Sequence, residues 1–235
     1  MDVPEHIVQT IRRKYSRPAK LSDPFSDFSQ EELKAIISKC DADLTETDLI
    51  CIFQSLLPAG NYNESVYFLP IALERFCKDD GDGASTLCDN MLRWIGQQKE
   101  RLESDGVYDE LLSFFGDAFA EMTSSFELAG DCPKNCGRAC AVFEALNAIS
   151  TVAALGDQLL RKHFGSAESY EQAAWLVFFL EQHLYGLYRH SAYLQDVSND
   201  KPLLRKAYDT ILSHALTEES LLLYWSKRLE SCGIW

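Results

Sequence analysis

Apolar residues recur every three or four positions along almost the whole chain, which is the spacing of one face of an α-helix. In the first such segment, Ile7, Val8 and Ile11 share a face after Pro4. Comparable segments continue to residue 231, and no Asn-Gly-type dipeptide between alternating runs predicts a β-hairpin. The pattern therefore predicts an all-α protein, a multi-helix bundle of about ten helices.

Several helix starts are predicted from capping residues. Ser29–Glu32 and Thr45–Asp48 have the spacing of a capping box, in which the first and fourth residues satisfy each other's backbone N–H groups. Asn63 is expected to cap the next helix, and Pro70 predicts a kink or a new start inside it. A further helix is expected over Ser85–Leu102.

The C-terminal part contains the most apolar segment of the chain, Ala173–Leu180. Ser166 or Ser169 is expected to cap the helix that carries it, and the helical spacing continues to about Tyr193. A helix that is apolar on all sides belongs at the centre of a bundle. The segment before it, Lys134–Phe164, also has helical spacing.

The net charge of −14 is distributed unevenly along the 235 residues. Residues 1–20 carry +3, residues 21–131 carry −16 and residues 132–235 carry −1. An acidic surface repels phosphate backbones and anionic lipids, so neither a nucleic acid nor a membrane is an expected partner. The charge step predicts an acidic N-terminal half, 1–130, and a second half, 131–235, which are separate domains or share one core.

No apolar run reaches the length of a membrane-spanning helix, and the N-terminus lacks the apolar segment of an export signal. We therefore expect a cytoplasmic protein. In a reducing compartment its eight cysteines are expected to be thiols. They stand at positions 40, 51, 77, 88, 132, 136, 140 and 232.

Cys132, Cys136 and Cys140 form the most unusual local motif. A spacing of four places side chains near one face of a helix, and Pro133 predicts that the helix starts here. The helix dipole would then lower the pKa of the nearby thiols. Zinc or redox chemistry are alternatives, but no second ligand pair accompanies the motif. We expect structural thiols, with no metal and no cofactor.

Motifs of catalytic sites are absent from the sequence. There is no HExxH, GxSxG, GxGxxG or GxxxxGK[ST], and the acidic loop Lys78–Gly83 does not match a calcium-binding EF-hand. The histidines show no Glu-x-x-His spacing either. The sequence thus predicts a protein that is not an enzyme.

The segment Tyr67–Leu73, an aromatic run entering a helix, resembles the Y-[YF]-L-P-A stretch of an uncharacterised family of small helical bacterial domains. The resemblance covers about residues 45–125, with Ile71 where the family usually has alanine. Some proteins of that kind are encoded near contact-dependent toxins. The resemblance implies an immunity protein, which neutralises a cognate toxin by binding it.

Combined with the acidity, this resemblance predicts a basic toxin as the partner. The expected binding surface is acidic and consists of Asp79, Asp80, Asp82, Glu100, Glu103, Asp105, Asp109 and Glu110. If the acidity serves only solubility, the expected surface moves to a groove near Tyr185, Tyr188, Arg189 and Tyr193. The alternative functions are a helical adaptor or regulator and, less favoured, a thiol or metal protein. The oligomeric state is not predicted.

Overall fold

Helices make up nearly all the regular structure of the chain. The computed structural model describes residues 2–54, 58–78, 82–149, 155–188, 191–216 and 219–232, with side chains omitted at 82–85, 148–149, 219–220 and 231. Within these ranges, thirteen α-helices have seven or more residues, and α4 (Tyr62–Ser65) is a single turn. The predicted all-α class is confirmed, although the helices are more numerous than the ten expected.

The chain divides into two compact units. Unit 1 comprises Met1–Ala118 and Cys140–Ile149, and unit 2 comprises Phe119–Ala139 and Ser150–Trp235. The limits at Ala118 and Ala139 fall inside the helices α8 (Tyr108–Met122) and α9 (Cys136–Ile149). The chain crosses from one unit to the other more than once, and the division into halves at residue 130 stays a prediction.

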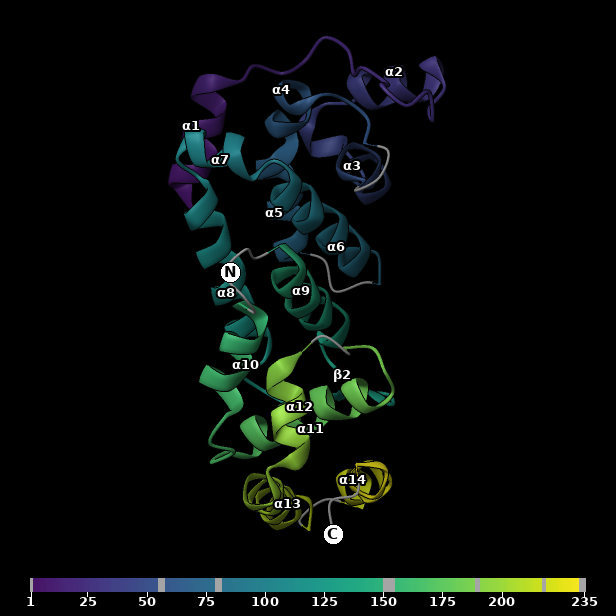
Figure 1. Cartoon of the computed structure of the whole chain (residues 1–235). Helices are drawn as coiled ribbons and strands as arrows, with labels where there is room; N and C mark the ends of the chain where they lie inside the picture. The colour runs from purple at the N-terminus through teal and green to yellow at the C-terminus, as the bar shows by residue number, and fades with distance from the viewer. Residues whose placement is uncertain are drawn as a thin grey trace. The chain divides into compact units, whose positions relative to one another are not determined.

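Unit 1 contains the helices that the N-terminal capping signals predict. Ser29 and Thr45 form capping boxes with Glu32 and Asp48, as predicted. The cap of α4 is Asn61, not Asn63, because the Asn61 side chain accepts the N–H groups two and three residues ahead. The elements are α1 (Glu5–Lys14), α2 (Gln30–Ser38), η1 (Asp41–Asp43), α3 (Glu46–Phe53), α4, η2 (Val66–Phe68), α5 (Leu69–Lys78), α6 (Asp82–Gln97), α7 (Lys99–Asp105) and α8 (Figure 1).

The core of unit 1 forms where α3, α5 and α6 pack on one another. Trp94 of α6 meets Phe53 edge-to-face, with ring centroids 5.1 Å apart, and stacks on Tyr62 at 5.8 Å. All three rings are buried. Pro70 lies in the first turn of α5, where its missing N–H costs nothing, so the predicted new start is confirmed.

The helix expected over Ser85–Leu102 is divided in the structure. Gln98 leaves the helical region with φ −100° and ψ 15°, and α7 begins at Lys99. Gly106 then ends α7 in the left-handed region, with φ +77°, which suits a residue without Cβ. Short α7 is therefore an additional element that apolar spacing alone does not separate from α6.

Unit 2 is built around α11 (Tyr170–Leu184), which contacts α10, α12, α13 and α14. Residues 173–181 of α11 are all buried, which confirms the prediction of a central helix. The aromatic core includes Phe126, whose ring centroid lies 5.3 Å from that of Trp175 and 5.2 Å from that of Trp225. The surrounding helices are α10 (Leu155–Phe164), α12 (Ala192–Asn199), α13 (Lys201–Ala215) and α14 (Glu219–Ser231). In Figure 1, α13 and α14 lie side by side in yellow.

Two expectations for this part of the chain are wrong. Helix α11 ends at Leu184 instead of continuing to Tyr193, because Gly186 adopts φ +88° and its N–H bonds back to the His183 carbonyl. A short antiparallel pair also forms, β1 (Leu128–Ala129) with β2 (Cys132–Pro133). It was not expected, because strands of two residues carry no alternating pattern.

Candidate functional site

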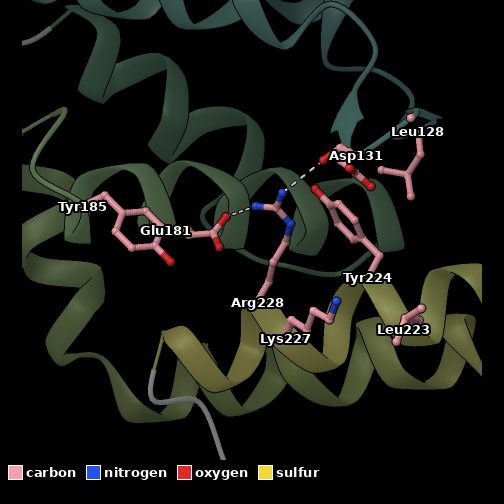
Figure 2. Close-up of a pocket in the computed structure, with 9 residues that line it drawn as sticks. Leu128, Asp131, Glu181, Tyr185, Leu223, Tyr224, Lys227 and Arg228 are labelled. Atoms are coloured by element: carbon pink, nitrogen blue, oxygen red, sulfur yellow. Dashed lines mark hydrogen bonds and ion pairs between the residues drawn. The ribbon is translucent and has the colours of Figure 1, made fainter.

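A pocket of about 500 Å³ opens on unit 2. Its walls come from three places: the C-terminal part of α11, one face of α14, and the hairpin formed by β1 and β2. Figure 2 shows Tyr224 and Arg228 of α14 pointing toward Asp131 at the hairpin, with Glu181 of α11 beside Arg228. The pocket is lined by Leu128, Gly130, Asp131, Glu181, Tyr185, Leu223, Tyr224, Lys227 and Arg228.

A buried ion pair forms the base of the pocket. Arg228 of α14 donates to the carboxylate of Glu181 on α11, and Glu181 is only 5% exposed. The other guanidinium nitrogen of Arg228 donates to the Asp131 carbonyl at 3.2 Å (Figure 2). A buried carboxylate requires such a partner, since an unpaired buried charge is strongly unfavourable. One arginine thus joins α14 both to the central helix and to the hairpin.

Tyr224 places a phenol beside this ion pair. The Arg228 guanidinium lies 4.3 Å from the centroid of the Tyr224 ring. The Tyr224 hydroxyl is buried and has no hydrogen-bond partner in the described part of the chain. Burial is the largest cause that raises the pKa of Tyr224 above its ordinary value; Arg228 opposes the shift, and Glu181 adds to it. The hydroxyl is therefore neutral at physiological pH and can donate or accept a hydrogen bond.

The rim of the pocket carries two exposed apolar side chains, Tyr185 and Leu223, beside two exposed charged residues, Asp131 and Lys227. The side chain of Tyr185 is 69% exposed and that of Leu223 is 62% exposed. Tyr185 also lines a second hollow of about 350 Å³ with Leu184, and Leu187 is exposed nearby in sequence. Exposed apolar side chains that gather around a hollow are typical of binding surfaces, whereas scattered single ones are not informative.

The alternative groove predicted from the tyrosines is assembled only in part. Tyr185 lies at the pocket rim, but Tyr188 and Tyr193 are buried. The ring of Tyr193 packs under the guanidinium of Arg161, 5.0 Å from its centroid. Arg189 lies outside the described residues. One of the four residues therefore contributes to the exposed surface that the structure describes.

The predicted acidic residues are placed in several different environments of unit 1. Asp79 and Asp80 lie outside the described residues, and Asp82 is the first residue of α6 with a side chain that is not described. Glu100, Glu103 and Asp105 lie on α7, and Asp109 and Glu110 begin α8. The described members are thus confined to α7 and the first turn of α8.

Asp105 forms hydrogen bonds and an ion pair within unit 1. Its carboxylate accepts hydrogen bonds from the hydroxyls of Tyr62 at 2.7 Å and Tyr15 at 2.8 Å, and from the Lys14 ammonium at 3.0 Å. Burial alone would raise the pKa of Asp105, but these three donors outweigh it and lower the pKa. Asp105 therefore holds α1 and α4 against α7.

Other acidic groups of unit 1 also bind its basic N-terminal segment. Glu110 pairs with His6, and Asp41 accepts from both Arg12 and Arg17. Arg12, Lys14 and Arg17, three of the five lysines and arginines in residues 1–20, are thus paired with acids of unit 1. The distribution of charge along the sequence does not reveal these ion pairs, because the paired residues lie 24 to 104 positions apart.

The remaining predicted residues form a small exposed group at the α7–α8 junction. Glu103 and Asp109 both lie close enough to Tyr108 to raise its pKa, although burial is the larger cause. Glu103 also pairs with Lys99 at 3.6 Å. Glu100 and Asp109 are exposed and form no ion pair among the described residues. Of the predicted acids whose side chains the structure describes, Glu100 and Asp109 are the two that are exposed and available to meet a partner.

The cysteine motif differs from its prediction. Cys132 lies in β2, outside the helix, and α9 begins at Cys136. The pKa of Cys136 is raised, not lowered, because burial and the neighbouring Cys132 outweigh the effect of nearby backbone N–H groups. Among the described side chains, no group of three or more His, Cys, Asp or Glu residues is placed to hold a metal ion.

Sequence reasoning missed the main components of the pocket, Glu181, Tyr224 and Arg228. One signal was present: Glu181 follows directly on the apolar run of α11, so its burial could be inferred. A buried acid needs a cation, but the sequence does not indicate which of the 22 lysines and arginines supplies it.

Among the described residues, no helix is long and apolar enough to cross a membrane. No protein-family model matches the chain, and no curated protein or solved structure is detectably similar to it.

Proposed function

We propose that the protein is a non-enzymatic protein-binding protein and that the pocket of unit 2 is its docking surface. The observation that carries the proposal is a hollow whose rim combines exposed apolar side chains, Tyr185 and Leu223, with the exposed charged residues Asp131 and Lys227. Apolar anchors around a few fixed polar groups are the usual composition of a binding hot spot.

The polar groups of the pocket suit binding better than catalysis. The carboxylate of Glu181 is occupied by Arg228, so it is not free to move a proton. The raised pKa of Tyr224 makes its phenolate scarce near neutral pH. A general acid or base works best when its pKa lies near the operating pH. The exposed Asp131 and Lys227 can instead orient a partner's side chain that enters the pocket.

For the partner we propose a basic toxin, which the chain would neutralise by covering it. The net charge of −14 favours association with a basic protein, since complementary charge speeds the encounter. The exposed acids at the α7–α8 junction contribute to this field. The resemblance of residues 45–125 to a family found near bacterial toxins supports an immunity role.

The proposal is tested by capture followed by a growth assay. The immobilised protein is incubated with a lysate of the producing organism, and retained proteins are identified by mass spectrometry. Each candidate is then expressed alone and together with this chain. A toxin partner arrests growth alone, and co-expression restores it.

Variants then assign the surface. Tyr185→Ala combined with Leu223→Ser should lose capture and protection, whereas the matched control Phe25→Ala, an exposed aromatic in unit 1, should keep both. Protection that survives the pocket variants would reject the docking surface. A specific partner that is harmless when expressed alone would replace the immunity role by that of an adaptor.

A further inference from the structure

Two hollows of unit 2 adjoin each other and are bordered by exposed apolar side chains. The pocket of about 500 Å³ and the hollow of about 350 Å³ share Tyr185 as a lining residue. Leu184 and Leu223 are also exposed lining residues, and Leu187 and Leu222 are exposed next to them in sequence. We call this surface the α11–α14 face. Apolar side chains grouped in this way are typical of a surface that another protein covers.

The charged groups that line the pocket balance one another. Glu181 and Arg228 form an ion pair at its base. Asp131 and Lys227 are exposed, and neither forms an ion pair among the described residues. Figure 2 shows Lys227 on α14 and Asp131 at the hairpin, so these two charges lie on different walls of the pocket. The rim therefore best fits a surface that also presents one base and one acid.

We propose that the α11–α14 face of one chain docks on the same face of a second copy, which forms a homodimer with twofold symmetry. In a twofold contact a patch faces itself, so that each residue of a contacting pair is used twice. Lys227 of each copy is then placed against Asp131 of the other, which gives two ion pairs. Tyr185 and Leu223 of the two copies cover each other's hollows between these pairs.

The distribution of charge between the two units also favours this face. Unit 1 has a net charge of −11, whereas unit 2 has a net charge of −3. Exposed like charges repel one another within a Debye length, which is about 10 Å at 0.1 M salt. Two copies of this acidic protein therefore approach each other with the least repulsion through unit 2.

The dimer uses the surface that we propose for a toxin, so a toxin must displace the second copy before it binds. This competition rests on the proposed function. The self-association does not, because it is measured on the purified chain with no other protein present.

Sedimentation equilibrium of the purified full-length protein tests the dimer. The wild type should change from the mass of one chain to the mass of two as the concentration rises. Lys227→Glu sets acid against acid in both contacts and should raise the dissociation constant of the dimer by about tenfold or more, since facing like charges are strongly unfavourable. Asp131→Lys sets base against base and should have the same effect.

The double variant Lys227→Glu with Asp131→Lys exchanges the two charges and should restore the dimer. The matched control is Lys201→Glu, the same change of charge at an exposed lysine of α13 that lines neither hollow, and it should dimerise like the wild type. Circular dichroism of each variant establishes that it is folded.

Three results would overturn the proposal. They are a wild type that stays monomeric at every concentration, a dimer that both single reversals leave intact, and single reversals that dissociate the dimer without rescue by the double variant. A chain that dimerises as expected but captures no toxin would reject the proposed function and support the dimer.

Discussion

The two units share a fold class but use their polar residues differently. Unit 1 contains 23 acidic and 12 basic residues, a net charge of −11, whereas unit 2 contains 13 and 10, a net charge of −3. In unit 1 the acids hold the N-terminal helix through Asp105, Glu110 and Asp41. In unit 2 the ion pair of Glu181 with Arg228 lines a pocket whose rim includes the exposed apolar side chains Tyr185 and Leu223.

This difference separates two contributions to binding. The charge of unit 1 is spread and partly neutralised within the unit, so it acts at long range and is weakened by salt. In the proposed complex, the pocket of unit 2 supplies apolar contact and polar groups, which act at short range and mainly affect the dissociation rate. Specificity is therefore expected from the less charged unit.

The largest effect should follow from breaking the buried ion pair of unit 2. Glu181→Ala leaves the Arg228 guanidinium without its carboxylate and should lower the free energy of unfolding by about 3 kcal/mol. Urea denaturation of the full chain measures this change. As a matched control, Asp209→Ala breaks the exposed pair with Arg205 on α13 and should cost less than about 0.5 kcal/mol. Equal losses of unfolding free energy in the two variants would show that the Glu181–Arg228 pair contributes no more than an exposed ion pair.

An intermediate effect is expected in unit 1 from Asp105→Ala. The variant removes the acceptor of the Tyr62 and Tyr15 hydroxyls and should cost about 2 kcal/mol at neutral pH. Exposed Asp117, also in unit 1, provides the control, and Asp117→Ala should leave the stability nearly unchanged.

The same variant predicts a pH dependence. Since the pKa of folded Asp105 is below its unfolded value of about 3.9, its stabilisation is present above that value and is lost as the pH falls through the folded pKa. The difference in stability between wild type and Asp105→Ala should therefore shrink as the solution is acidified below about pH 4. A difference that stays constant down to pH 2 would contradict the proposed role of the carboxylate.

A small effect on stability is expected at the pocket rim. Tyr185 and Leu223 are mostly exposed, so Tyr185→Ala and Leu223→Ser should each change the free energy of unfolding by no more than about 0.5 kcal/mol. Circular dichroism melts of the two variants would test this. A large loss of stability would mean that these side chains support the fold and are not reserved for a partner.

Much of the helical fold could be predicted from the sequence because its signals are local. The capping boxes at Ser29 and Thr45 and the central position of α11 depend on residues within one or two turns of each other. The end of α11 was also locally encoded by Gly186, although continued apolar spacing concealed it. Errors arose where a tight turn interrupts a pattern that continues on both sides.

The candidate sites depend on contacts that no local signal specifies. Arg228 meets Glu181 across 47 positions, and Asp105 meets Tyr15 across 90. Cys132 lies outside α9 because it belongs to a hairpin that is too short to show alternation in the sequence. Composition therefore indicated an acidic surface, and only the fold shows which acids remain available on it.

The most direct test of the binding account compares the rate constants of two variants with the identified partner by surface plasmon resonance. Leu223→Ser should mainly raise the dissociation rate constant, because it removes a short-range contact of the pocket. Glu100→Lys combined with Asp109→Lys should mainly lower the association rate constant, and this effect should fade as salt rises from 0.1 M to 1 M and the Debye length falls from about 10 Å to about 3 Å. Unchanged dissociation from Leu223→Ser, with dissociation accelerated instead by the charge reversals, would contradict the account and place the binding surface on unit 1.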